Sequence, residues 1–375
     1  MLFKISIIIG TRPNIIKIIK LYNILKSVFN ISLIHTGQHH SSSMKNIFFD
    51  ELDLPNPDYS FFIKSNIIAG VLQDLIYSNF KNPSNIISRL LNTNSSLLGQ
   101  IGEIMDNITS ALNIIKPDLV IVVGDVTSTL AGALSAYKLN IPIAHIESGL
   151  RSTDLSMPEE VNRILVDHLS TYYFITEPSG IINLQNENYH DHLYLVGNTM
   201  IDTLKLNKDK IDNIHLNFNI KNYIVVTLHR PSNVDNDEVL QNIVSNLKII
   251  YDKGINIIFP VHPRTKSKLK QKENNFITFI EPQGYLEFIH LIKNSLYVIT
   301  DSGGIQEETT SLGIRCFTLR KNTERPITLI KNGGTNTLIN DINEIEIIKF
   351  DYNPFKLWDG NASVRIRDIL LKLSY

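Results

Sequence analysis

The chain has 375 residues, enough for two domains that each bury a core of their own. Its 36 Lys and Arg residues balance 37 Asp and Glu residues, and a formal net charge of -1 excludes a protein drawn to nucleic acid or anionic lipid by a global field. The single cysteine, Cys316, excludes an intramolecular disulfide framework and a cysteine-rich zinc site, and it indicates a reducing compartment.

The first 20 residues, MLFKISIIIGTRPNIIKIIK, are the most apolar part of the chain. Their apolar run covers only residues 5–9 and contains a serine, and Arg12 and Lys17 follow without a small-residue cleavage site. We therefore predict a buried strand that leads into a helix. Because a membrane span needs about 18 uninterrupted apolar residues and the sequence has no such stretch, we predict no membrane association and a cytoplasmic protein.

Short apolar runs that end in glycine or polar residues alternate with segments of helical period along the whole chain. Strands are predicted at Ile5–Ile9, Ile31–His35, Leu119–Val123, Ile143–Ile146, Tyr172–Ile175, Leu193–Val196, Ile224–Thr227, Ile255–Val261, Ile277–Ile280 and Leu296–Thr300. Helices between them include Thr127–Lys138, Glu160–Ser170, Val239–Lys253 and Gly304–Leu312.

This alternation predicts an α/β fold with parallel sheets covered on both faces. Turn residues at Glu177–Gly180 suggest a boundary between two doubly wound, Rossmann-like domains, residues 1–178 and 179–360. We expect a ligand cleft between the domains. Since ligands of such sheets bind beyond the carboxyl ends of the strands, the residues that follow each strand are the candidates for a site.

Gly10-Thr11-Arg12-Pro13 follows the first strand, and Lys17 lies one helical turn further on. A tight turn at a helix N-terminus with two cations indicates an anion or phosphate site. The alternative is an ordinary turn with two solvated cations. Neither G-x-G-x-x-G nor G-x-x-x-x-G-K-[ST] occurs, so the sequence supports neither a dinucleotide-binding motif nor a P-loop.

Three acidic residues follow strands or precede a helix in the first half: Asp125, Glu147 and Glu159. Taken singly, Asp125 is explained equally well as a helix cap, and Glu147 as the partner of Arg151 or Arg163 in a structural ion pair. Three carboxylates at one edge of a sheet favour acid/base chemistry over these separate explanations.

In the second half, His229-Arg230 and His262-Pro263-Arg264 each follow a predicted strand. Two histidines placed beside arginines at strand ends favour an anionic ligand.

The strongest local motif is DSGGIQEE, which follows a strand and opens a helix. Ser302, Gly303 and Gly304 would present backbone N–H groups to a pyrophosphate, and Glu308, one turn inside, could accept both hydroxyls of a ribose. The alternative is a Ser-capped helix with a capping-box acid. The loop that contains Arg325 offers another cation.

Two patterns imitate metal sites. Asp235-x-Asp237 is better explained as the acidic first turn of the following helix, and His190-Asp191-His192 has no third ligand in view. We predict no metal and no organic cofactor.

Taken together, these motifs resemble the non-hydrolysing UDP-N-acetylglucosamine 2-epimerases, and the resemblance runs from Gly10 nearly to the C-terminus. The matching stretches are GTRPNIIK, HTGQHH, VVGDVTSTLAGALSAYKLNIPIAHIESGLRS, MPEEVNRILVDHL, VGNTMIDTL, VTLHRPSN, EPQGYLEF, TDSGGIQEETTSLG and TLRKNTERP. Relatives usually have Glu where this chain has Asn14.

The resemblance implies two Rossmann-like domains of glycosyltransferase-B type with the active site in the interdomain cleft. The segment NPFKLWDGNASVRIRDIL is similar to a closing helix, about residues 361–375, that returns to the first domain. The resemblance also implies a homodimer. By motif it assigns catalysis to Asp125, Glu147, Glu159 and His229, and contacts with the UDP-sugar to Arg12, Lys17, His262, Gln283, Phe288, Ser302, Gly303, Gly304, Glu308 and Arg325.

The implied reaction is reversible C2 epimerisation of UDP-N-acetylglucosamine to UDP-N-acetylmannosamine. UDP is eliminated from C1 as the C2 proton is lost, which gives 2-acetamidoglucal, and re-addition then delivers a proton to the other face. Four alternatives stay open: a 2-epimerase of a diacetamido sugar or uronic acid, a glycosyltransferase of the same fold, a hydrolysing epimerase, and a non-catalytic nucleotide-sugar sensor. The sensor is disfavoured because every catalytic position that the resemblance implies is filled. The turn GTRP argues against the hydrolysing class, and the three acids argue against a transferase.

Overall fold

A computed structural model describes residues 3–38, 51–61, 95–216, 220–261, 268–269 and 275–374. Backbone contacts divide the chain into two compact units. The first unit comprises Met1–Gly149, Thr153–Val196 and Ser363–Tyr375, and the second comprises Leu150–Ser152 and Gly197–Ala362.

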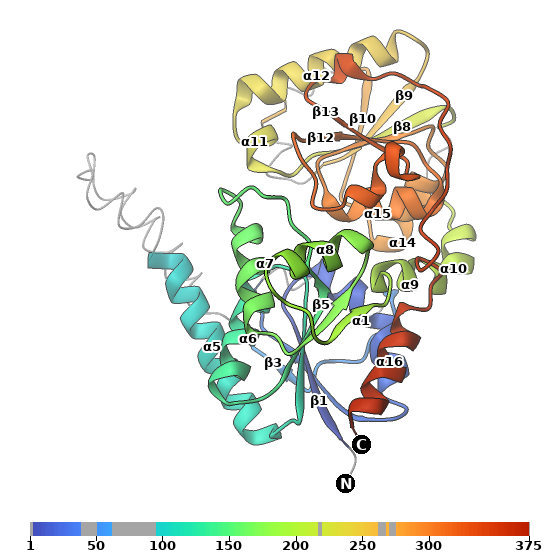
Figure 1. The fold of residues 1–375 in the computed structure, drawn as a ribbon. Helices are drawn as coiled ribbons and strands as arrows, with labels where there is room; N and C mark the ends of the chain where they lie inside the picture. Colours follow the sequence, from blue (N-terminus) through green and yellow to red (C-terminus); the bar gives the residue numbers. More distant parts are fainter. Residues whose placement is uncertain are drawn as a thin grey trace, which may run out of the picture. The chain divides into compact units, whose positions relative to one another are not determined.

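The first unit is built on a seven-stranded parallel sheet (Figure 1). The strand order is β3-β2-β1-β4-β5-β6-β7. The strands are β1 (Lys4–Ile9), β2 (Asn30–His35), β3 (Tyr59–Ser60), β4 (Leu119–Val123), β5 (Ile143–Ser148), β6 (Tyr172–Ile175) and β7 (Leu193–Leu195). Every residue of β4 and β5 is buried, which confirms the prediction of strands covered on both faces.

Six described helices belong to this unit: α1 (Arg12–Leu25), α5 (Ser95–Ile115), α6 (Thr127–Lys138), α7 (Pro158–Leu169), α8 (Pro178–Asn186) and α16 (Ala362–Leu373). Side chains of α5, α6 and α7, including Ile104, Leu130 and Val166, form one buried cluster with Ile8 and Val122 of the sheet. Helix α16 ends the chain yet lies in the first unit, where it appears in red in Figure 1.

The second unit contains a six-stranded parallel sheet of order β10-β9-β8-β11-β12-β13. The strands are β8 (Tyr223–Thr227), β9 (Asn256–Pro260), β10 (Ile277–Ile280), β11 (Val298–Thr300), β12 (Cys316–Leu319) and β13 (Asn336–Ile339). Numbered from the start of the unit, this is the order 3-2-1-4-5-6 of a doubly wound sheet. The expectation of two Rossmann-like α/β domains is thus confirmed.

The described helices of the second unit are α9 (Thr199–Leu206), α10 (Lys208–Asp212), α11 (Pro231–Val234), α12 (Asp237–Tyr251), α14 (Tyr285–Lys293) and α15 (Gly303–Leu312). Three short 3-10 helices, Pro326–Thr328, Ile330–Asn332 and Ile342–Glu344, follow β12 or β13. Leu240, Val244 and Leu247 of α12 are spaced as one helical stripe and pack with Ile257 and Phe259 in the core. None of the helices described here is long and apolar enough to cross a membrane.

The chain passes from one unit to the other at Val196, later than the expected boundary near residue 178. The physical reason is that β7 pairs with β6 in parallel and extends the first sheet. Helix α8 covers this edge, where Leu184 packs with Tyr173 and Ile175. The turn residues at 177–180 therefore mark a strand-to-helix turn inside the first unit.

Candidate active site

Each sheet has a point at which the strand order reverses, between β1 and β4 in the first unit and between β8 and β11 in the second. Loops leave the carboxyl ends of these neighbouring strands toward opposite faces, and such points are the usual ligand sites of doubly wound sheets. The predicted residues Arg12, Asp125, His229 and Ser302 all follow one of these four strands.

Asn14 joins the two loops at the first of these points. Its Oδ1 accepts hydrogen bonds from the backbone N–H groups of Gly10 and Thr11, both at 3.1 Å, and its Nδ2 donates to the carbonyl of Val123 at 2.9 Å. A carboxylate could accept the first two bonds but could not donate the third. The residue at which this chain departs from its relatives therefore connects β1 to β4.

Lys17 and Glu147 form a buried ion pair beside the same loops. Lys17 is 6% exposed and Glu147 is 4% exposed. Both side chains reach the backbone of Gly124, since a Cβ placed on that residue would lie 3.3 Å from Lys17 Nζ and 3.9 Å from Glu147 Oε2. Burial of two charges is tolerated only because each neutralises the other.

The backbone of Glu147 is unusual. Its φ of 72° lies in the left-handed region, and the pairing of β5 with β6 shifts register between Ile146 and Ser148. A bulge of this kind redirects a side chain at the end of a strand, and the conformation costs about 1–3 kcal/mol for a residue other than glycine. Such local strain is typical of functional sites, which supports the sequence-based assignment of Glu147.

Asp125, at the end of β4, is held by two residues of α7. Its Oδ2 accepts from Arg163 Nε at 2.9 Å, and its backbone carbonyl accepts from Asn162 Nδ2 at 2.8 Å. The alternative explanation of Asp125 as a cap of α6 is wrong, because α6 has Val126 at its N-cap without a side-chain cap. Gln38 accepts the hydrogen bond from the backbone N–H of Ser128 instead.

The adjacent acids Glu159 and Glu160 have opposite environments. Glu159 is exposed. Glu160 is 1% exposed, forms an ion pair with Arg163 and accepts a hydrogen bond from the backbone N–H of Thr153 at 2.8 Å. Arg163 thus bridges Asp125 and Glu160, which leaves Glu159 as the acid of this pair that is accessible to a ligand.

Arg12 is the first residue of α1, at the N-terminal end where the helix dipole favours an anion. Burial lowers the pKa of Arg12 from its ordinary value, although a guanidinium stays protonated at neutral pH. A partly desolvated cation at a helix N-terminus suits the binding of a phosphate.

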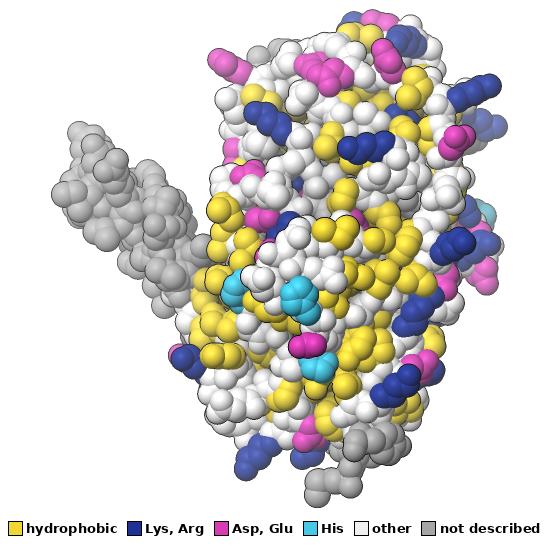
Figure 2. Space-filling model, in the orientation of Figure 1, with side chains coloured by type: hydrophobic (Ala, Val, Ile, Leu, Met, Phe, Trp, Pro, Cys, Tyr) yellow, Lys and Arg dark blue, Asp and Glu magenta, His cyan; other side chains and the backbone are white. Residues whose placement is uncertain are grey.

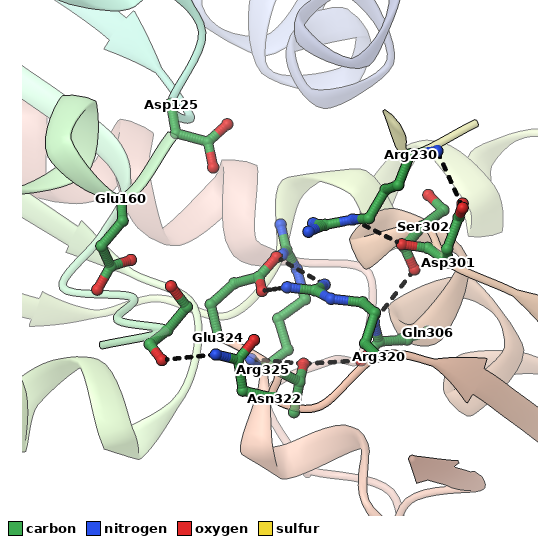
Figure 3. Close-up of polar contacts among 12 residues, drawn as sticks. Asp125, Glu160, Arg230, Asp301, Ser302, Gln306, Arg320, Asn322, Glu324 and Arg325 are labelled. Carbon is green, nitrogen blue, oxygen red and sulfur yellow. Dashed lines mark hydrogen bonds and ion pairs between the residues drawn. The ribbon is translucent and has the colours of Figure 1, made fainter. Parts of the chain in front are cut away.

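At the reversal point of the second sheet, Asp301 collects hydrogen bonds from the loop that follows β8. His229 Nδ1 lies 2.7 Å from Asp301 Oδ1, and Oδ2 accepts from the backbone N–H of Arg230 at 2.9 Å and from Asn233 Nδ2 at 3.0 Å (Figure 3 shows the Arg230 contacts). Burial alone raises the pKa of Asp301, but the hydrogen bonds and charge of His229, with those from Asn233 and Arg230, outweigh it and lower the pKa. Asp301 therefore stays ionised and fixes His229, whose side chain is 61% exposed.

Ser302, Gly303 and Gly304 open α15 as expected. Ser302 occupies the N-cap position but makes no side-chain capping hydrogen bond within the described structure. The alternative of a Ser-capped helix with a capping-box acid is therefore wrong. The backbone N–H groups and dipole at this N-terminus suit a phosphate ligand.

A buried charge cluster lies against the start of α15. Arg325 pairs with Glu324, and Arg320 Nη2 donates to Glu324 at 2.6 Å (Figure 3). Arg325 also pairs with Glu307 through Nε at 3.0 Å. A Cβ on Gly303 would lie 2.6 Å from Arg325 Nη1, so the glycine makes room for this cluster. Arg325 already has two carboxylate partners, and its contact with UDP stays a prediction.

Gln306 ties α15 to the strands and loops around it. Its Oε1 accepts from Thr323 Oγ1 at 2.7 Å and from Asn336 Nδ2 at 3.0 Å, and its Nε2 donates to the carbonyl of Ser302 at 3.2 Å. This network fixes the position of the α15 N-terminus relative to the loop that contains Arg325.

The remaining predicted residues have varied environments. Glu308 is 5% exposed on α15, and Gln283 and Phe288 are partly buried, with Gln283 Nε2 donating to the carbonyl of Glu281 at 2.6 Å. His262 lies outside the described residues. Among the described residues, no group of three or more His, Cys, Asp or Glu side chains is placed to hold a metal ion. Asp237 is the first residue of α12, as the sequence indicated.

Sequence reasoning assigned no orienting role to Asn162, Asp301, Gln306, Glu307 or Glu324. It named Asn14 only as a departure from relatives and Arg163 only as a possible partner of Glu147, whereas Arg163 pairs with Asp125 and Glu160. A usable signal existed for Arg163, which follows Glu159 and Glu160 by four and three residues and must share a helical face with them. Asp301 is the first residue after β11, the position from which the other site acids were selected.

Comparison with known proteins places these features in a family. The sequence profile described as UDP-N-acetylglucosamine 2-epimerase matches residues 71–371. The chain is 41% identical to the UDP-N-acetylglucosamine 2-epimerase of Methanocaldococcus jannaschii over 393 aligned positions, which cover 98% of each chain. It is 34% identical to the UDP-2,3-diacetamido-2,3-dideoxy-D-glucuronate 2-epimerase of Pseudomonas aeruginosa, covering 99% of this chain and 100% of the relative.

Solved structures agree. The crystal structure of the M. jannaschii UDP-GlcNAc 2-epimerase in complex with UDP-GlcNAc and UDP matches with a TM-score of 0.82 at 38% identity, covering 99% of this chain and 100% of that one. The Neisseria meningitidis UDP-GlcNAc 2-epimerase bound to UDP-GlcNAc matches with a TM-score of 0.78 at 28% identity and the same coverage. The chain belongs to the UDP-N-acetylglucosamine 2-epimerase family, and it is an isomerase.

Proposed function

We propose that the protein catalyses the reversible C2 epimerisation of UDP-N-acetylglucosamine to UDP-N-acetylmannosamine without net hydrolysis. The observation that carries the proposal is the pair of carboxylates Asp125 and Glu147, each held by a buried cation at the reversal point of the first sheet. Full-length similarity to UDP-GlcNAc 2-epimerases supports the choice of substrate.

The chemistry requires elimination because the C2 hydrogen is not adjacent to a carbonyl and is too weakly acidic for simple removal. A base takes the C2 proton while the C1–O bond to UDP breaks, and the products are 2-acetamidoglucal and UDP. In the reverse step UDP adds to C1 and a proton reaches C2 from the opposite face. Two acid/base groups are therefore needed, together with groups that stabilise UDP as it leaves.

We assign the proton at C2 to Asp125 and Glu147, with Glu159 tuning or sharing it. Lys17 and Arg163 pair with the first two carboxylates and hold them in fixed positions, so little reorganisation is needed when a proton moves. Glu159 is exposed and so is accessible to a ligand.

We assign His229 and Arg12 to departure of the pyrophosphate. Since Asp301 binds Nδ1 of His229, Nε2 is the ring nitrogen that would exchange a proton or hydrogen bond with the ligand. We assign UDP binding to the start of α15, with Ser302, Gly303 and Gly304 at the pyrophosphate and Glu308 at the ribose, and further contacts from Gln283, Phe288, His262 and Arg325.

Proton NMR of the purified protein with UDP-N-acetylglucosamine in deuterated water tests this function. The expected result is UDP-N-acetylmannosamine with deuterium at C2 and UDP still attached. Free UDP together with N-acetylmannosamine would place the protein in the hydrolysing class. No change with this substrate, but turnover of the diacetamido uronic acid sugar, would show that the proposed sugar is wrong.

We further infer a homodimer that works in the cytoplasm. Exposed apolar side chains occur on the neighbouring helices α6 and α7, namely Tyr137, Val161 and Leu165, and Ile182 of α8 is exposed as well. Figure 2 shows many hydrophobic side chains on the surface of the protein. Burial of such side chains would favour association of two copies. Light scattering coupled to gel filtration measures the mass, and a mass of one chain would contradict the dimer.

A further inference from the structure

We propose that His145 and Asp167 form a positioning pair that fixes the two catalytic loops of the first unit, those of Asp125 and Glu147, at the separation the reaction needs. The proposal rests on the proposed function for its kinetic consequences. Neither residue was selected by the sequence, and neither is accessible to a ligand, since both are 0% exposed.

His145 connects β5 to the loop after β4. Its Nδ1 lies 2.6 Å from Asp167 Oδ1, and its Nε2 lies 2.9 Å from the carbonyl of Gly124. Gly124 precedes Asp125 directly, so His145 holds the peptide on which the first catalytic acid is mounted. The backbone N–H of Gly124 in turn donates to the carbonyl of Ile146 at 3.0 Å, which completes a double link between the two strands.

Asp167 connects α7 to the loop after β5. Its second oxygen, Oδ2, accepts from the backbone N–H of Gly149 at 3.0 Å. Gly149 lies two residues beyond the strained Glu147 and has a φ of 78°. One buried carboxylate thus receives bonds from His145 and from the bulged loop, and through His145 it reaches Gly124.

Helix α7 is the common support of these contacts. Arg163 and Asn162, one turn before Asp167, bind the carboxylate and the carbonyl of Asp125. Loss of Asp167 would leave Asp125 bound to α7 but would release Gly149 and His145 from that helix. The loops of the two catalytic acids would then no longer be held by the same helix.

The hydrogen-bond pattern supplies a variant that separates position from charge. The Gly124 carbonyl only accepts, so Nε2 of His145 must carry a proton. Asparagine at position 167 can donate its Nδ2–H to an unprotonated Nδ1 and accept the Gly149 N–H with its Oδ1. Asp167→Asn therefore preserves both of these connections and removes the charge, whereas Asp167→Ala breaks both.

The expected result is a loss of kcat of about 10–100-fold in Asp167→Ala with KM changed by less than about threefold, because misplacement of the reacting groups acts on the chemical step. Asp167→Asn should keep kcat within about threefold of wild type, since its geometry is intact. If the Asp167→Ala protein does not fold, Asp167→Ser takes its place, because the shorter serine hydroxyl cannot bond to both His145 and the Gly149 N–H.

Tyr173→Phe is the matched control. The Tyr173 hydroxyl donates to the carbonyls of Asp167, at 3.1 Å, and Ser170, at 3.0 Å, at the end of the same helix, and neither of these described contacts reaches a catalytic loop. We expect a lower melting temperature with kcat unchanged. A purely structural role of Asp167 would give this same pattern in Asp167→Ala, and that result would overturn the proposal.

Hydrogen exchange gives a readout that does not depend on turnover. Amides of the segment 145–150 should exchange faster in Asp167→Ala than in wild type and at the wild-type rate in Asp167→Asn. If wild type does not epimerise UDP-N-acetylglucosamine, the proposed function fails while this comparison still tests the pair. Equal exchange in all three proteins, or equal loss of kcat in both variants of a catalytically active enzyme, would contradict the positioning role.

Discussion

Lys17 of α1 and Glu147 at the bulged end of β5 neutralise each other in the interior of the first unit, where both are less than 10% exposed. The two residues come from strand-helix units that are distant in sequence, and their meeting places a cation and a carboxylate beside Gly124. The pair therefore fixes the position of a carboxylate that we propose takes part in catalysis, and loss of either partner would leave the other charge buried without a counter-charge.

Replacement of one partner of this pair should therefore affect both activity and stability. Lys17→Met leaves the buried Glu147 without its cation, and we expect a loss of about 3–5 kcal/mol in the free energy of unfolding together with loss of activity. The double variant Lys17→Met/Glu147→Gln removes both charges, so it should recover most of the stability while it stays inactive. Urea unfolding and the NMR assay measure the two effects. A double variant no more stable than Lys17→Met would show that the charge pair is not the cause.

Asp301 gives a prediction about pH. Its pKa is lowered in the folded protein, so the carboxylate contributes stability that is complete above the unfolded-state value of about 3.9 and is lost as the pH falls through the folded-state pKa. The difference in unfolding free energy between wild type and Asp301→Asn should be larger at pH 5 than at about pH 2–3. The measurement is urea unfolding at both pH values. A difference that does not shrink in acid would contradict the lowered pKa.

Much of the fold could be predicted because strands buried on both faces have nearly continuous β-branched sequences. Leu119–Val123 and Tyr172–Ile175 were predicted to the residue. Strands β12 and β13 were missed because CFTL contains neither Val nor Ile and NTLI is half polar, and a two-residue strand such as β3 has no period to detect. Parallel pairing with established neighbours, which stabilises these strands, is a tertiary effect.

The sequence was enough to predict which residues belong to the candidate site, but not which residues they contact. Residues after strand ends are selected by topology alone, which is why Asp125, Glu147 and Ser302 emerged from the sequence. Their partners depend on long-range packing: Asp125 and Arg163 are 38 residues apart and meet because α7 packs beside α6. Asp301 was read as part of a nucleotide motif, whereas its carboxylate orients His229.

The adjacent acids of α7 provide the third prediction. Glu159→Gln changes an exposed side chain, so the unfolding free energy should stay within about 0.5 kcal/mol of wild type while epimerisation is lost. Glu160→Gln breaks the buried pair with Arg163, so it should reduce stability by about 3 kcal/mol or more.

Thermal or urea unfolding and the NMR assay on both variants separate the two roles, and each variant serves as the control of the other. If Glu160→Gln were stable but inactive while Glu159→Gln stayed active, the catalytic acid would be Glu160 and not Glu159.

The glycines that open α15 provide the fourth prediction, because their surroundings differ. A methyl group at position 303 would lie 2.6 Å from Arg325 Nη1 and 2.7 Å from Glu324 Oε1, so Gly303→Ala should disturb the buried charge cluster and lower the melting temperature. A methyl group at position 304 would meet only Met200, at 3.6 Å, which is an ordinary contact. Gly304→Ala should therefore fold with the stability of wild type.

If the pyrophosphate of UDP binds against this N-terminus, the methyl group of Gly304→Ala occupies space that the ligand needs. We expect its dissociation constant for UDP to rise by about tenfold or more, equivalent to about 1.4 kcal/mol, although the free protein is unperturbed. Isothermal titration calorimetry with UDP measures this. Wild-type affinity in Gly304→Ala would place the pyrophosphate away from Gly304, and an unchanged melting temperature in Gly303→Ala would show that the cluster of Arg325 and Glu324 yields to a methyl group.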